Sequence, residues 1–134
     1  MPESIEGVNF KADKIIESID RVPYPLPDLT YLKEMAGGDE AFVEEIITYF
    51  IEFGPDSLLR MRESALSGDY EKLRFCAHTL LPQLTFVGIL SAIPYVEKIE
   101  KDCNLNDKLF VELDSAIKII SYGIEDLKSM ILMS

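Results

Sequence analysis

The only histidine of the chain, His78, is the residue best suited to chemistry near neutral pH. Imidazole is the one side chain that titrates there without help from its surroundings, and its neutral ring carries a nucleophilic nitrogen. His78 stands in a largely apolar run, LRFCAHTLLPQLTFVG, over residues 73–88. The helix predicted for this run decides whether the ring meets partners or fills the core.

Apolar residues of this run recur at spacings of three and four, which predicts a helix with one buried stripe. At about 100° per residue, His78 lies about 130° from the centre of that stripe, so we expect an exposed imidazole. The stripe consists of Leu73, Ala77, Leu80, Leu84 and Val87. The expected surroundings of the ring form a docking patch: Arg74, Leu81, Pro82 and Thr85 on the same flank, with Phe75 and Phe86 further round.

Other roles for His78 stay open on local sequence alone. A lone histidine in an apolar helix is most often a packed or solvated side chain without a function. No second histidine exists, and no carboxylate stands three or four residues before or after His78, so we expect no metal site. A catalytic triad would need a serine or cysteine nucleophile from elsewhere in the chain.

Capping and breaking residues divide the rest of the chain into helices. Asp28, Asp39 and Asp69 are predicted N-caps, and glycines at 37–38, 68 and 88 are predicted stops. The second helix is expected to bend or break at Gly54-Pro55. Further helices are predicted over 91–101, with Pro94 in the first turn, and over 108–132. The apolar stripe of the second helix is expected on Phe42, Ile46, Tyr49, Phe50 and Phe53, and continues through Leu58, Met61 and Ala65.

These helices predict an all-α fold, because no segment alternates with a period of two over a useful length. We expect one domain over residues 28–134, an antiparallel four-helix bundle with a short extra helix packed across one end. Residues 1–27 are expected to form an N-terminal arm. The arm holds a possible short helix over 12–19 and a proline-rich, extended connector over 22–27.

Composition and charge make some classes of partner and location unfavourable for the chain. Its 24 acidic and 13 basic residues give a formal net charge of −11, which disfavours nucleic acid and anionic membrane surfaces. The two cysteines match neither a zinc nor a disulfide pattern, and the start of the sequence does not resemble a secretory signal, so a cytoplasmic location is expected. The uncharged run over 79–96 is better explained by two buried helices and a turn than by a membrane span.

The surroundings of His78 resemble those of histidine-containing phosphotransfer (HPt) domains, the helical phosphocarriers of two-component relays. The family motif reads Ala-His-x-Leu-Lys-Gly with a further glycine ten residues after the histidine, and Ala77, His78, Leu80 and Gly88 occupy matching positions. The resemblance spans roughly residues 28–130. Its other matching positions are Gly38, Asp39, Phe42, Phe50, Pro55, Ala65, Gly68, Asp69, Leu73 and Glu100.

The resemblance implies a phosphocarrier and not a turnover enzyme. His78 would accept a phosphoryl group from a receiver-domain aspartate and pass it on, with Gly88 as a structural residue. The implied partners are a response-regulator receiver domain, a hybrid sensor kinase, or both. The magnesium ion would reside on the receiver, so the chain itself needs no cofactor, and a monomer is expected because the carrier needs a free face.

Two positions depart from the family pattern beside the reacting site. Leu81 replaces the lysine that would offset phosphoryl charge, and Pro82 replaces a small residue and removes the N–H partner of the His78 carbonyl. Arg74, one turn earlier, is placed to supply the missing charge, although a solvated helix residue is the plain alternative. Gln83 is expected to bond across the bundle. A second hypothesis follows from the lost lysine: an HPt-like interaction module that binds a receiver or kinase without efficient transfer.

Overall fold

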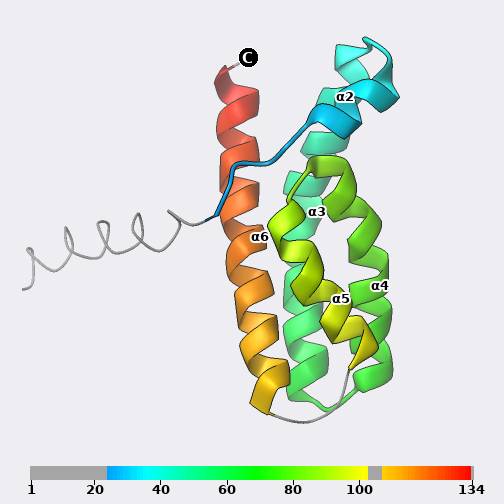
Figure 1. Cartoon of the computed structure of the whole chain (residues 1–134), viewed down its shortest axis with the longest axis vertical. Coiled ribbons are helices and arrows are strands. Elements are labelled where there is room, and N and C mark those ends of the chain that lie inside the picture. The colour runs from blue at the N-terminus through cyan, green and yellow to red at the C-terminus, as the bar shows by residue number, and fades with distance from the viewer. Residues whose placement is uncertain (1–23, 103–106, 134) are drawn as a thin grey trace, which may run out of the picture.

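The described part of the computed structural model, residues 24–102 and 107–133, is helical and contains no β-strand. Figure 1 shows its helices side by side, with the short helix α2 at one end. Their bounds are α2 Thr30–Ala36, α3 Glu40–Leu66, α4 Tyr70–Val87, the 3-10 turn η1 Leu90–Ala92, α5 Ile93–Lys101 and α6 Asp107–Met133. The all-α prediction is therefore confirmed for these residues. The predicted helix over 12–19 and the predicted turn over 104–107 lie largely or wholly outside them.

The ends of the helices follow the predicted capping residues. The Asp39 carboxylate accepts a hydrogen bond from the Phe42 N–H, and the Asp69 carboxylate accepts one from the Lys72 N–H, both at 3.1 Å. Asp28 differs slightly, because its carboxylate accepts the Thr30 N–H at 3.0 Å while Leu29 occupies the N-cap position. Gly37 and Gly88 end α2 and α4 in the left-handed conformation, as predicted.

Helix α3 continues through Pro55 over its whole length, so of the two predicted outcomes the break does not occur, and the bend stays a prediction. Pro55 lacks one backbone N–H donor. The hydrogen bonds of the turns before and after it, and the packing of α3 against α4 and α6, keep the helix continuous. The preceding Gly54 is buried, and a Cβ at this position would lie 3.2 Å from Ile124 Cδ1 of α6. Gly54 therefore lets α3 and α6 approach closely.

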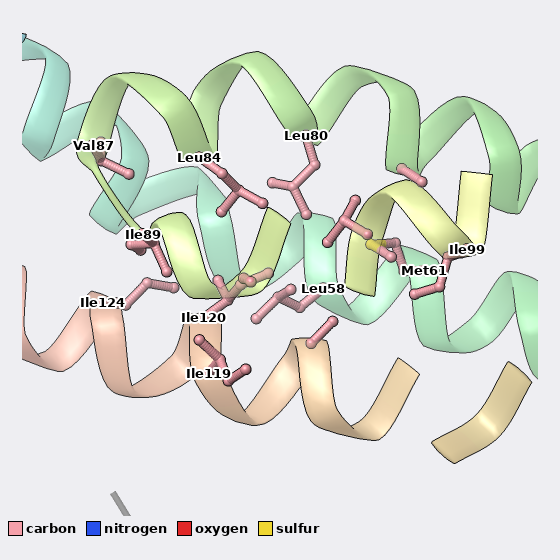
Figure 2. Close-up of a cluster of buried hydrophobic side chains, with 14 of the residues drawn as sticks. Leu58, Met61, Leu80, Leu84, Val87, Ile89, Ile99, Ile119, Ile120 and Ile124 are labelled. Atoms are coloured by element: carbon pink, nitrogen blue, oxygen red, sulfur yellow. The ribbon is translucent and has the colours of Figure 1, made fainter. Parts of the chain in front are cut away.

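The helices pack in a simple pattern. Helix α3 packs against α4 and α6, α5 packs against the same two helices, and α2 contacts α3 and α4. Their apolar faces meet in one shared interior, where Leu80 and Leu84 of α4 approach Leu58 of α3 and Ile120 of α6 (Figure 2). The whole predicted stripe of the His78 helix is buried: Leu73, Ala77, Leu80, Leu84 and Val87.

The predicted apolar stripe of α3 is wrong at three of its first five residues. Phe50 is buried and Ile46 packs partly buried against the core, but Phe42, Tyr49 and Phe53 are 36%, 54% and 47% exposed. The buried line instead contains Ile47, Phe50, Gly54, Leu58, Met61 and Ala65. The packing of α3 against α4 and α6 buries this line and leaves the three aromatic rings at the surface.

The segment before α2 crosses the end of the His78 helix. Tyr24 packs on Tyr122 of α6 with ring centroids 5.9 Å apart, and Pro27 is buried. The Asp28 N–H then donates a hydrogen bond to the Gly88 carbonyl at 2.9 Å. The described residues of the predicted connector are non-helical, and the boundary at residue 27 stays a prediction.

The uncharged run over 79–96 is divided between the end of α4, a turn, η1 and the start of α5, as expected. Among the described helices, none combines the length and apolar character required to cross a membrane.

Candidate functional site

His78 lies on the outer face of α4, and its side chain is 73% exposed. The neighbouring Ala77 is fully buried, so the helix turns the imidazole outward while packing firmly beneath it. The predicted exposure of the ring is confirmed.

The imidazole is held by a carboxylate from the next helix. His78 Nδ1 lies 2.6 Å from Glu100 Oε2 of α5, whose side chain is 26% exposed. An ionised carboxylate can only accept a hydrogen bond, so Nδ1 carries the proton and donates it. In the neutral ring the lone pair therefore resides on Nε2, at the opposite edge of the imidazole. The pair produces an oriented ring with a defined nucleophilic nitrogen.

The turn at Gly88 brings Glu100 back to His78. The chain reverses there, so that α5 runs along α4, and the two residues lie 22 positions apart in the sequence. Gly88 has φ +74°, and a Cβ at this position would overlap the backbone of Asp28. Gly88 thus has the structural role expected of it, for two separate reasons.

Arg74 is joined to the same residue of α5. Its Nε donates a hydrogen bond to the backbone carbonyl of Glu100 at 3.3 Å. Arg74 and His78 therefore stand one turn apart on α4, each bonded to Glu100. The bond to Glu100 keeps the guanidinium on the side of α4 that faces α5, where the imidazole is also held.

The other predicted site residues are divided between two surroundings. Phe75 is 69% exposed and Pro82 is also exposed, whereas Leu81 is partly buried against the core. Thr85 is exposed and donates its hydroxyl to the Leu81 carbonyl at 3.3 Å, a contact within α4. Phe75 and Pro82 therefore offer exposed apolar surface on the same helix as the ring.

Phe86 belongs to the other end of α4. It is half-buried, and its ring stacks on Tyr31 of α2 with centroids 5.7 Å apart. Phe86 therefore packs against α2 and not beside His78. Among the predicted site residues, Arg74 shares a hydrogen-bond partner, Glu100, with His78.

Helix α4 continues through Pro82, and the expectation for Gln83 is wrong. Gln83 Nε2 donates to the Thr79 carbonyl of the same helix at 3.4 Å instead of bonding across to another helix. Helical side chains lean toward the N-terminal turn, which brings the amide to this carbonyl.

From the sequence, Glu100 was identified only as a position that matches the family pattern and not as a site residue, because Glu100 lies far from His78 along the chain. Its position contains a usable signal: it follows Gly88 by twelve residues, and His78 precedes Gly88 by ten. Two helices joined by a tight turn bring residues at similar distances from that turn side by side.

Comparison with protein-family models, with curated proteins and with solved structures found no match to the chain. Its function is therefore argued from the geometry around His78.

Proposed function

We propose that the chain is a histidine phosphocarrier of the HPt type, which accepts a phosphoryl group on His78 from a receiver-domain aspartate and passes it to another. The observation that carries this proposal is the 2.6 Å bond between His78 Nδ1 and Glu100, made by an imidazole that is otherwise open to solvent. A phosphocarrier needs an oriented and accessible ring nitrogen, and Nε2 meets both needs. The packing of α3 and α5 against α4 and α6 supports the antiparallel four-helix bundle that the family requires.

The transfer needs no redox partner and no group beyond the two proteins and the receiver's magnesium ion. The Nε2 lone pair forms the new nitrogen–phosphorus bond while the bond from phosphorus to the aspartate oxygen breaks, and the carboxylate leaves with its electron pair. The ring then carries positive charge with its proton still on Nδ1. The Glu100 carboxylate stabilises that charge and keeps the ring from turning. The same steps in reverse pass the group to a second receiver.

Arg74 takes the place of the family lysine in this proposal. A guanidinium pairs well with phosphoryl oxygens, and the Nε–H that Arg74 donates to α5 is one of the five N–H donors of the group. Leu81, at the lysine position, then contributes apolar docking surface together with Pro82 and Phe75. The carrier works as a monomer in the cytoplasm, and the magnesium ion required for transfer resides on the receiver.

The direct test is incubation with receiver domains that carry labelled aspartyl phosphate, in the presence of magnesium. We expect an acid-labile, base-stable label on the chain that disappears in His78→Gln. Phe75→Ala, which leaves the imidazole intact, should weaken docking without abolishing the label. Absence of label from every receiver encoded beside the chain's gene would overturn the proposal. Receiver binding that persists without label, and unchanged in His78→Gln, would select the interaction module instead.

Glu100 is a positioning residue in this scheme, and its role has a spectroscopic readout. Glu100→Ala should shift the nitrogen-15 signals of the ring toward a mixture of tautomers, because Nδ1 loses its acceptor. The His78 ring is mostly exposed, so the pair is worth about 0.2–1 kcal/mol and the labelling rate should fall by up to about fivefold. Unchanged ring signals would contradict this role.

A further inference from the structure

The exposed aromatic residues of α3 form a surface that the phosphocarrier proposal does not use. Phe42, Tyr49 and Phe53 recur at spacings of seven and four residues, and the Tyr49 and Phe53 rings stack with centroids 4.6 Å apart. On the helix they lie about 110–150° from the centre of the buried line. We call these three residues, together with Glu45 and Glu52 between them, the α3 outer face.

Carboxylates lie beside the Tyr49 ring. Glu44, Glu45 and Glu52 line a hollow of about 340 Å³ together with Ala41, Thr48 and Tyr49. Within the part of the chain that the structure describes, none of these three glutamates forms a salt bridge, unlike Asp56, which pairs with Arg60 at 2.9 Å. A larger cavity of about 690 Å³ adjoins this hollow, since both include Ala41 and Glu44.

The α3 outer face is separate from the His78 site. Helices α3 and α5 each pack against α4 and α6, so they lie on opposite sides of that pair. His78 is bonded to Glu100 of α5, whereas the outer face points away from the buried line of α3. A partner on the outer face would therefore leave the imidazole accessible.

We propose that the α3 outer face binds a basic amphipathic helix of a partner protein. Stacked aromatic rings offer the apolar contact area for such a helix, and the unpaired glutamates beside them complement lysine or arginine residues flanking its apolar stripe. A second copy of this chain fits poorly, because a net charge of −11 on each copy opposes self-association. Residues 1–23 fit poorly for the same reason, since they contain more acidic than basic residues. This inference does not depend on phosphotransfer.

The experiment is an NMR titration of the full chain with an 18-residue helical peptide built from leucine and lysine. We expect chemical-shift changes concentrated over residues 41–56, and an affinity that falls with added salt. The double variant Tyr49→Ala/Phe53→Ala should weaken binding about tenfold or more. The matched control is Val111→Ala on α6, which removes another exposed apolar side chain and should change the affinity little.

Three results would overturn this proposal. Shift changes spread over all acidic surfaces, with equal affinity in the double variant, would show attraction by net charge alone. A dimer in sedimentation analysis that Tyr49→Ala/Phe53→Ala dissociates would assign the face to a second copy. Nuclear Overhauser contacts from the Tyr49 or Phe53 ring to residues 1–23 in the free chain would assign it to the chain's own N-terminal segment. Labelling of His78 is measured separately, so failure of one proposal leaves the other testable.

Discussion

A methyl group at Gly88 would test how the segment before α2 is held against the His78 helix. Gly88 combines φ +74° with the backbone of Asp28 placed where a Cβ would project. Gly68 is the matched control, because its φ is +76° and a Cβ there would meet no atom within 4 Å. Comparing alanine at the two positions separates the conformational cost from the cost of the contact.

The expected losses differ in size. An L-residue in the left-handed region costs about 1–2 kcal/mol, and the lower entropy of the unfolded alanine variant returns about 0.4–1 kcal/mol. Gly68→Ala should therefore cost about 0–1.6 kcal/mol. Gly88→Ala must also displace Asp28 and weaken its 2.9 Å hydrogen bond, which is worth about 0.5–1.5 kcal/mol. Adding the displaced packing, we expect a loss of about 2–4 kcal/mol.

Urea unfolding followed by circular dichroism measures both variants. With an m-value of about 2 kcal/mol/M, Gly88→Ala should lower the midpoint by about 1–2 M without changing m. Gly37→Ala, with φ +58° and open space, provides a second control and should resemble Gly68→Ala. Equal losses at Gly88 and Gly68 would refute the argument, because the crossing at Asp28 would then contribute nothing to stability.

Three further predictions concern packing and titration. Gly123→Ala should lower the free energy of unfolding by about 1–3 kcal/mol despite the better helix propensity of alanine, because its Cβ would lie 2.8 Å from Ile89 Cγ1. Adding Ile89→Ala to the same chain should recover part of that loss. If the losses of the two variants simply add, the contact is contradicted. Burial raises the pKa of the Cys76 thiol, so iodoacetamide at pH 8 should alkylate it more slowly than free cysteine when the other cysteine is replaced by serine, and an equal rate would contradict the effect of burial. The hydrogen bond to Glu112 raises the pKa of Lys98 above its usual 10.5. The stability contributed by this pair is present below pH 10.5 and is lost as the pH rises through the folded-state pKa of Lys98. The Tm of Lys98→Met should therefore lie below that of the parent at pH 7 and meet it in strong alkali, and a constant difference would contradict this.

Local chemistry explains which parts of the fold were predictable. The caps at Asp39 and Asp69 and the stops at Gly37 and Gly88 depend on a few adjacent residues, and each formed as expected. The buried face of α4 was equally clear, because one line of apolar residues, from Leu73 to Val87, continues along the helix at spacings of three and four.

Helix α3 shows where this reasoning fails. It has apolar residues on two sides, and only its contacts with α4 and α6 decide that Phe50 is buried while Tyr49 and Phe53 are exposed. A single-helix pattern contains no information about that choice.

The part of the candidate site that lies on α4 was predictable, and the part that lies on α5 was not. The outward direction of His78 follows from α4 alone, and the position of Arg74 follows from it. Glu100 contacts the ring only because two helices fold back on each other, so its role required the geometry of the Gly88 turn.

The length of that turn determines whether Glu100 reaches His78, about 15 Å away along the helix axis. A single residue inserted between Ile89 and Ala92 would rotate α5 by about 100° and carry the Glu100 carboxylate out of reach of the imidazole, although both side chains would be unchanged. Homologous chains could therefore be ranked by the number of residues between the glycine and the acid. Those that keep twelve should keep the oriented ring, and those of another length should need a different acceptor for Nδ1.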